Sequence, residues 1–331
     1  MGTPEYSAAQ LKWLVDHDYD VVGVVSQPDR PAGRGRKLTP PAVKIMADEL
    51  GLPCLQPEDL KAPDFLDSLS AFESDLFVVV AYSILPLEVL AIPPKGSVNL
   101  HTSLLPKYRG AAPIQWSVLN GDDFTGLTVF QLDFKMDHGP VLVRRQVPIE
   151  PGESSGQLFE KMIPAGQLAI ADALSELSKP QPNFQEQDHS SATKAPKLFK
   201  EMGDINWHQN TDQLVAWING LNPWPMAYTS LHSKVHRLNQ ALPWHGEEFN
   251  VKDPNPSQDP GTLAWGPSKE LLIRTLDGWI EIHGIQPQGK KAQTGADLFN
   301  GLNEKFGQKF ECQIDEETLV KIKKLQASTQ V

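Results

Sequence analysis

Short runs of β-branched and aliphatic residues alternate with helical periods through the first 150 residues, and this alternation most strongly constrains the fold. Buried strands are predicted at 21–25, 77–81, 97–101 and 127–132. Helices are predicted around them, at about 5–17, 40–51, 58–71, 111–120 and 155–177. Continuous apolar strands interleaved with helices are typical of a parallel sheet covered on both faces. The sequence therefore predicts an α/β domain over residues 1–178, with a Rossmann-like, doubly wound and mostly parallel sheet.

The start of this domain departs from the pattern. A doubly wound domain usually begins with a strand, whereas the helical period here begins within about five residues of Met1. The strand that would precede Gly2-Thr3-Pro4 is missing, and its loss would leave backbone groups of two neighbouring strands unpaired. We therefore expect a misplaced start or a trimmed chain, rather than a variant fold.

The composition changes after the first domain. Residues 179–206 are polar with little apolar periodicity, which indicates a linker. Residues 207–331 begin with a predicted helix near 211–220. Short strands separated by Pro and Gly are then predicted at 227–231, 261–265, 271–276 and 279–282. This punctuation favours a small C-terminal β-barrel of the OB-like kind, or a sandwich.

Composition and charge narrow the class of protein. The net charge of −11 argues against nucleic-acid binding through the whole surface, although it leaves room for a local basic patch. Cys54 and Cys312 are the two cysteines of the 331 residues, so a disulfide framework is not expected. The sequence has no run of about 20 apolar residues, no signal-peptide pattern at its start and no metal-type histidine spacing. We expect a cytoplasmic protein without a metal.

The end of the predicted strand at 97–101 presents an amide and an imidazole. Residues two apart on a strand point to the same face, so Asn99 and His101 share one side of the sheet. Ligands of open α/β sheets bind beyond the carboxyl ends of the strands. Asp137 follows the next predicted strand, whose end could face the same crevice. An oxyanion donor, an acid/base and an orienting carboxylate would together suit acyl transfer.

Other interpretations of this stretch stay open. Asn99 and His101 could be a polar strand end with a solvated imidazole. Asp133 and His138 compete with Asp137 and His101 for the same roles. No Ser or Cys stands in a nucleophile-elbow motif, which favours direct transfer to an incoming nucleophile.

A basic, glycine-containing segment follows the first predicted strand. Between Asp29 and Lys44 there are five basic side chains and one acidic one. Such a loop could contact phosphates, or it could be an exposed, solubilising loop. It matches neither the Walker A motif nor the dinucleotide fingerprint. Lys290-Lys291 is a weaker candidate for a phosphate contact. Trp224, in Asn222-Pro223-Trp224-Pro225, could belong to a binding edge, but we expect a rigid turn with the indole packed against the second domain.

Several of these stretches together resemble one family. Residues 97–142, with Asn99-Leu100-His101, Ser103–Pro106, Tyr108–Gln115 and Asp137, resemble the formyltransferases that use 10-formyltetrahydrofolate. The segments Gln27–Gly35, Asn222–Pro225 and Gln286–Lys291 resemble the members of that family that act on methionyl-tRNA. The resemblance extends from Gly2 to about Gly307. The segment 81–86 departs from it, being one residue shorter with Ser where Gly is common, and His138 stands where a small hydroxyl residue is usual.

The resemblance implies an activity, with 10-formyltetrahydrofolate as formyl donor and initiator methionyl-tRNA as acceptor. It implies that Asn99 stabilises the oxyanion, that His101 assists it and moves a proton, and that Asp137 orients His101. It further implies a monomer that needs no metal. The implied folate-binding residues are Ser103, Leu104, Leu105, Pro106 and Tyr82. The implied tRNA-binding residues are Arg30, Arg34, Arg36, Lys37, Lys290 and Lys291.

Two alternatives remain at this point. One is another folate-dependent enzyme with the same Asn/His/Asp site, either a formyltransferase acting on a sugar amine or ribonucleotide, or a formyl-folate hydrolase. The other is a non-catalytic RNA-binding or folate-binding protein.

Overall fold

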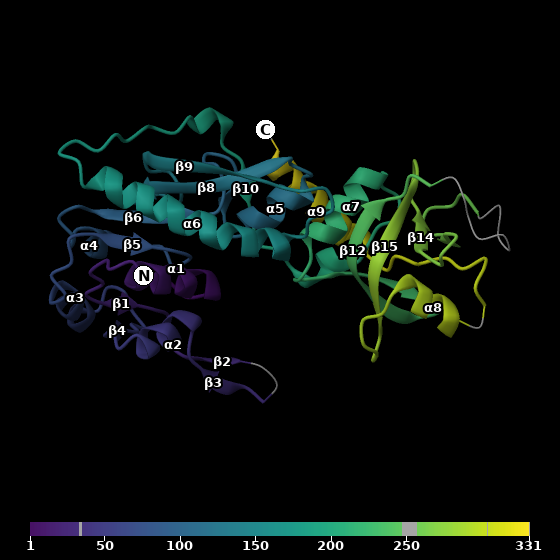
Figure 1. Cartoon of the computed structure of the whole chain (residues 1–331), viewed down its shortest axis with the longest axis horizontal. Helices are drawn as coiled ribbons and strands as arrows, with labels where there is room; N and C mark the ends of the chain where they lie inside the picture. Colours follow the sequence, from purple (N-terminus) through teal and green to yellow (C-terminus); the bar gives the residue numbers. More distant parts are fainter. Residues whose placement is uncertain (33–34, 247–256, 303, 331) are drawn as a thin grey trace. The chain divides into compact units, whose positions relative to one another are not determined.

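The computed structural model describes residues 1–32, 35–246, 257–302 and 304–330 (Figure 1). The chain divides into two compact units. The first comprises Met1–Arg109, Gly126–Val147 and Glu160–Ala192, and the second comprises Gly110–Thr125, Pro148–Phe159 and Thr193–Val331. The chain enters each unit more than once, so neither unit is one continuous segment.

The first unit holds the Rossmann-like α/β arrangement that the sequence predicts. Its helices are α1 (Glu5–Asp16), α2 (Ala42–Glu49), α3 (Pro63–Ser70), α4 (Leu87–Leu90) and most of α6 (Ser155–Leu177). Strands β1 (Val24–Val25) and β4 (Cys54–Leu55) pair in parallel, and β2 (Arg30–Ala32) and β3 (Lys37–Thr39) form an antiparallel hairpin. A four-stranded sheet has the order β5 (Phe77–Val79), β6 (Ser97–His101), β8 (Phe124–Gln131), β9 (Val141–Pro148).

The direction of β8 differs from the prediction. Strands β5 and β6 are parallel, but β6 and β8 are antiparallel, with His101 opposite Thr128 and Val98 opposite Gln131. The prediction of a mostly parallel sheet was wrong here, and the sheet is mixed. A parallel neighbour needs a crossover connection, usually a helix packed on the sheet. The helix after β6, α5 (Pro113–Leu119), belongs to the second unit instead, so it does not serve as that crossover.

Helix α6 covers one face of the sheet at strand β6, and the polar side chains of β6 lie on the other face. Figure 1 shows α6 lying across β6 and β8. A Cβ added at Gly166 of α6 would come within 3.1 Å of the Leu100 side chain and 2.4 Å of the Tyr6 hydroxyl, so glycine permits this close approach. Since side chains alternate along a strand, Asn99 and His101 point away from α6.

The first two residues pair with the backbone of strands β1 and β5. The Gly2 amide donates to Val25 O (3.0 Å), and the Val80 amide donates to Met1 O (2.9 Å). Gly2 also forms a parallel bridge with Val80. Two residues thus run between β1 and β5. Beside them is a cavity of ≈ 320 Å³ whose lining includes Met1, Val24, Phe72 and Phe77.

The second unit contains an antiparallel five-stranded sheet. Its order is β11 (Ala227–Leu231), β12 (Lys234–Pro243), β15 (Trp279–Pro287), β14 (Leu271–Arg274), β13 (Leu263–Trp265). Its helices are α5, α7 (Thr211–Gly220), α8 (Gly295–Gly301) and α9 (Glu316–Thr329). The predicted helix and four predicted strands of this region are confirmed. The prediction missed β12, which follows a turn at His232 and Ser233, both with positive φ but without the usual glycine or asparagine.

A later segment pairs with both sides of this sheet. Glu311 and Ser230 of β11 exchange two backbone hydrogen bonds (2.9 and 3.1 Å). The Leu263 amide of β13 donates to Gln308 O (2.9 Å), and the Phe310 amide donates to Gly261 O (2.8 Å). Residues 308–311 therefore satisfy backbone groups of both edge strands.

The segment 179–206 is more structured than its composition suggests. It contains η1 (His189–Ser191), β10 (Lys194–Ala195) and η2 (Lys200–Gly203). Gln187, Leu198 and Ile205 are buried, and Gln185 forms a bridge with Val141. Among the described residues, no helix is both long and apolar enough to span a membrane.

Candidate functional site

Strand β6 places Asn99 and His101 in the middle of the four-stranded sheet. Asn99 lies between Val79 of β5 and Phe130 of β8, and His101 is 6% exposed. A cluster of Leu105, Phe130 and Val141, with Leu132 packed against it, forms the apolar surroundings of this region. The two polar side chains thus project from a strand that is paired on both sides, as the sequence predicts.

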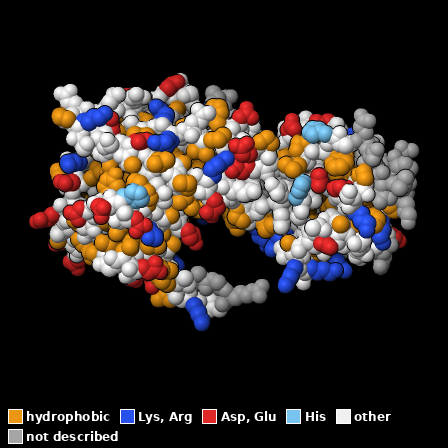
Figure 2. Space-filling model, viewed as in Figure 1, with side chains coloured by type: hydrophobic (Ala, Val, Ile, Leu, Met, Phe, Trp, Pro, Cys, Tyr) orange, Lys and Arg blue, Asp and Glu red, His pale blue; other side chains and the backbone are white. Residues whose placement is uncertain are grey.

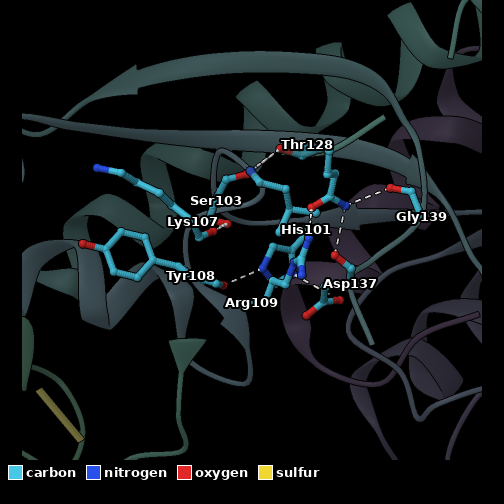
Figure 3. A network of polar contacts seen from close by, with 10 residues as sticks. His101, Ser103, Lys107, Tyr108, Arg109, Thr128, Asp137 and Gly139 are labelled. Atoms are coloured by element: carbon cyan, nitrogen blue, oxygen red, sulfur yellow. Dashed lines mark hydrogen bonds and ion pairs between the residues drawn. The ribbon is translucent and has the colours of Figure 1, made fainter. Parts of the chain in front are cut away.

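The His101 ring is fixed by a backbone carbonyl (Figure 3). Its Nε2 lies 2.9 Å from Tyr108 O. Because a carbonyl oxygen can only accept, Nε2 must carry the hydrogen. The other nitrogen, Nδ1, lies 4.0 Å from Asp137 Oδ1. This is an ion-pair distance, longer than a hydrogen bond, and both side chains are largely buried.

Asp137 reaches His101 by a route that the sequence pattern does not indicate. We expected the end of the strand before Asp137 to lie at the same edge as the end of β6. That expectation was wrong, because β8 is antiparallel and its last residue, Gln131, lies opposite Val98 near the start of β6. His101 is three residues further along β6 than Val98, so the loop 132–140 must run back roughly 10 Å along β6 to reach it. Asp137 meets His101 because this loop folds back.

The loop is closed against the end of β8. The Gln131 amide donates to Pro140 O (2.9 Å). A Cβ added at Gly139 would lie 1.8 Å from Gln131 O, so only glycine fits this approach. Within the loop, Asp133 Oδ1 accepts from the Lys135 amide (2.7 Å). Asp133 therefore caps a turn, whereas Asp137 is the carboxylate that lies 4.0 Å from His101 Nδ1.

Arg109 links this loop to the segment after α6. Its Nη1 lies 2.9 Å from His138 Nε2, and its Nη2 lies 2.8 Å from His189 Nδ1. The two imidazoles stack with centroids 4.7 Å apart. Burial, then the positive charge of Arg109, lowers the pKa of His138. His138 thus serves as an acceptor for Arg109, whereas His101 is the imidazole that faces Asp137.

The loop after β6 is held by a hydrogen bond between its own residues and by Thr128 of β8. Ser103 Oγ donates to Lys107 O (2.6 Å), and Thr128 Oγ1 donates to Ser103 O (2.7 Å) while accepting from the Leu105 amide (3.0 Å). Ser103 and Leu105 are buried. The Ser103 and Thr128 hydroxyls thus hold the loop, and Leu104 and Pro106 are its partly exposed side chains.

Apolar side chains are exposed around the candidate site. Tyr82, which follows β5, is half-buried, and burial raises its pKa to about 12. Ile84 and Leu87 are exposed after the same strand, and Phe134 and Met136 are exposed on the loop that carries Asp137. Exposed apolar side chains beside polar groups are typical of ligand sites. The surroundings therefore suit a partly apolar ligand.

The predicted basic segment is an exposed hairpin of the first unit. Arg30 lies on β2, and its Nη2 is 3.9 Å from Glu58 Oε2. Both side chains are exposed. Arg36 lies in the turn with φ 48°, and Lys37 begins β3. Arg34 lies outside the described residues. Figure 2 shows Lys and Arg side chains at this hairpin.

The second unit has its own basic edge. Lys290 and Lys291 are exposed directly after β15, where Gln288 pairs with Val235 at the start of β12. Figure 2 shows Lys and Arg side chains gathered at this end of the unit. The expectation that Trp224 packs against the domain was wrong, since its side chain is 54% exposed. Leu221, three residues earlier, is buried.

Several residues around the site carried no recognisable signal in the sequence. Arg109 stands in the Tyr108-Arg109-Gly110 stretch, but nothing there indicates its partners. Thr128 appears as an ordinary strand residue, and Gln187 and His189 lie in a segment that resembles a linker. Within the described parts of the chain, no group of three or more His, Cys, Asp or Glu could hold a metal ion.

The chain matches two family models. Residues 1–174 match the model described as formyl transferase, and residues 197–303 match the formyl transferase C-terminal domain. The methionyl-tRNA formyltransferase of Desulfotalea psychrophila is 42% identical over 295 residues, covering 89% of each chain. That of Geobacter metallireducens is 37% identical, covering 91% of this chain and 94% of the relative.

Solved structures share the fold at lower identity. WlaRD, a sugar 3N-formyl transferase solved with dTDP and 5-N-formyl-THF, has a TM-score of 0.60 at 15% identity, covering 88% of this chain and 97% of its own. HypX from Aquifex aeolicus, solved with tetrahydrofolic acid, has a TM-score of 0.53 at 19% identity, covering 76% of this chain and 43% of its own. At these identities the likeness concerns the fold alone.

Proposed function

Because the chain belongs to the formyltransferase family, we propose that it formylates methionyl-initiator tRNA. The formyl group of 10-formyltetrahydrofolate passes to the α-amine of the esterified methionine, giving N-formylmethionyl-tRNA for translation initiation. Relatives with this activity in their names match about nine-tenths of the chain. The observation that carries the mechanism is the His101 ring, which bonds Tyr108 O through Nε2 and faces Asp137 through Nδ1.

The chemistry is a direct acyl transfer. The methionine amine attacks the formyl carbon on N10 of the folate, and the carbonyl oxygen becomes an oxyanion. The Asn99 amide donates to that oxyanion, a contact typically worth about 10²–10³ in rate. The attacking amine gives up a proton to His101 Nδ1, and Asp137 stabilises the resulting imidazolium. The C–N10 bond then breaks, N10 takes up the proton that His101 holds, and tetrahydrofolate leaves with His101 neutral again. No step needs a metal.

The folate lies along the backbone of Ser103–Pro106, with its pterin near Tyr82. Two observations support this arrangement. The loop is held in place by Thr128 and by Arg144 Nε, which donates to Leu105 O (3.1 Å). In addition, the exposed Ile84, Leu87, Phe134 and Met136 offer apolar contacts to a flat ring.

The tRNA is bound by basic side chains of both units. The proposed contacts are Arg30, Arg34, Arg36 and Lys37 of the hairpin segment, and Lys290 and Lys291 after β15. RNA ends are recognised through shape, phosphates and unstacked bases, which suits a basic hairpin. Local patches also reconcile RNA binding with a net charge of −11.

The proposal includes a domain organisation. Residues 1–178 are the catalytic domain, 179–206 a linker, and 207–331 an OB-like barrel that binds tRNA. The pairing of residues 308–311 with both edge strands supports closure of the five-stranded sheet into a barrel. The enzyme acts as a cytoplasmic monomer, and analytical ultracentrifugation tests the oligomeric state.

A formylation assay tests the function directly. The protein is mixed with 10-formyltetrahydrofolate and methionyl-initiator tRNA, and formylmethionyl-tRNA is measured. Elongator methionyl-tRNA and free methionine are the controls. Product from the initiator alone supports the proposal. Formylation of a nucleotide-linked amino sugar but not of tRNA would contradict it in favour of a sugar formyltransferase, and release of formate would favour a hydrolase. Binding of tRNA or folate without turnover would favour a non-catalytic relative.

A further inference from the structure

Gln187 lies beside the loop that carries Asp137, with all the polar atoms of its side chain engaged. Its Nε2 donates to Asp137 O (3.0 Å) and to Gly139 O (2.8 Å). Its Oε1 accepts from Arg109 Nη2 (2.6 Å). The side chain is 5% exposed. An amide supplies two hydrogens from one nitrogen together with an acceptor, so this residue type matches its surroundings.

The Asp137 loop depends on such a contact. Strand β8 leads away from His101, and the loop must fold back to bring Asp137 to it. Asp137 itself has φ 55°, in the left-handed region that non-glycine residues adopt at a cost of roughly 1–2 kcal/mol. The sheet alone does not hold the loop in this conformation. Gln187 bonds the two carbonyls on either side of His138 and thereby opposes its relaxation.

Arg109 joins Gln187 to both imidazoles. It contacts His138 on the loop, and Gln187 and His189 on the segment after α6. These hydrogen bonds connect Asp137 to Gln187, Gln187 to Arg109, and Arg109 to His138, the residue next to Asp137. A Glu at position 187 would keep an acceptor for Arg109, but it would turn a carboxylate oxygen toward two carbonyl oxygens.

We propose that Gln187 is a positioning residue for catalysis. It acts through Asp137, by holding Oδ1 at its distance of 4.0 Å from His101 Nδ1. The segment after α6 then contributes to the active site and does more than connect domains. This inference rests on the proposed function, since Asp137 matters only if His101 moves a proton.

The test compares two substitutions with a matched control. Gln187→Glu keeps the shape and the Arg109 contact, and Gln187→Ala removes all contacts. Gln185→Ala is the control, since that side chain is exposed and reaches Arg144 (3.5 Å), not the Asp137 loop. Misplacing a catalytic group by about 1 Å can cost 10²-fold in rate. We expect both Gln187 variants to lower kcat by about 10–100-fold with little change in KM for the folate, and Gln185→Ala to match the wild type.

A double-mutant cycle distinguishes positioning from general destabilisation. If Gln187 acts through Asp137, adding Gln187→Ala to Asp137→Ala lowers kcat no further. The inference is overturned if the two effects multiply, or if Gln187→Glu lowers only the unfolding midpoint while the folded enzyme turns over normally. An inactive wild type, in contrast, would refute the proposed function and the inference with it.

Discussion

The Asp137 loop and the β2–β3 hairpin both belong to the first unit, but they are held in different ways. The loop is fixed by buried side chains, with Gln187 on two of its carbonyls and Gly139 against the end of β8. The hairpin is held by its own backbone pairing, from Arg30 with Thr39 to Ala32 with Lys37, and its Leu38 is exposed.

Each way of holding the backbone suits the role that we propose for the segment. Proton transfer and oxyanion stabilisation require atoms held within fractions of an ångström, which buried hydrogen bonds provide. Phosphate contacts depend on charge, and they carry no such geometric demand on the backbone. The loop should therefore be sensitive to single substitutions in kcat, and the hairpin to charge and salt in KM.

His101→Ala should have the largest effect, because it removes the proton-transfer group from the fixed region. We expect kcat to fall by about 10²–10⁴-fold. The hydrogen bond between His101 Nε2 and Tyr108 O is also lost, which should lower the free energy of unfolding by about 0.5–1.5 kcal/mol. Single-turnover formylation measures the first effect and urea denaturation the second. Near-normal turnover in the folded variant would remove His101 from the site.

Asn99→Ala should have the next largest effect. Removal of one oxyanion donor typically costs about 10²–10³ in kcat. Asn120→Ala is a matched control, since the Asn120 amide donates to Thr329 Oγ1 (3.0 Å) in the second unit. If the activity of both variants falls equally, Asn99 has no special role in the reaction.

The sequence predicted much of this fold because its signals are local. Helix α7 and strand β6 were predicted with their observed bounds, since apolar periodicity marks them directly. The direction of β8 could not be predicted in the same way. It depends on α5 belonging to the second unit, and no local pattern encodes that choice.

The candidate site shows the same limit. Asn99 and His101 share a face because they are two residues apart on one strand. Asp137 comes from a different loop, and its backbone carbonyl accepts from Gln187, fifty residues later in a polar segment. A buried glutamine looks like a solvated one in the sequence, because burial is decided by tertiary packing.

The hairpin should respond to charge removal through KM. We expect Arg36→Ala or Lys37→Ala to raise KM for tRNA by about threefold to tenfold at low salt, with kcat and folate affinity unchanged. The salt dependence of binding should weaken by about one unit of slope for each phosphate that the variant no longer neutralises. Lys12→Ala is the control, because Lys12 pairs with Asp16 on α1 (2.8 Å). An equal fall in folate affinity would contradict the assignment of the hairpin to tRNA.

Protonation of His138 should have the smallest effect, and that effect is on the free energy of unfolding at acidic pH. Burial and the charges of Arg109, His189 and Lys135 lower its pKa from 6.5, and Asp133 opposes them only in part. Neutral His138 Nε2 accepts from Arg109 Nη1, and a protonated ring cannot.

Since the pKa of His138 is lower in the folded state, the unfolded state takes up the proton first as the solution is acidified. Neutral His138 therefore makes its full contribution to the free energy of unfolding above about pH 6.5. That contribution is lost as the pH falls through the pKa of His138 in the folded state. An NMR titration of the His138 ring should give a midpoint below 6.5, and Arg109→Gln should move it back upward. A midpoint at or above 6.5 in the wild type would mean that Arg109 does not hold this imidazole, and that the loop is less fixed than the comparison with the hairpin requires.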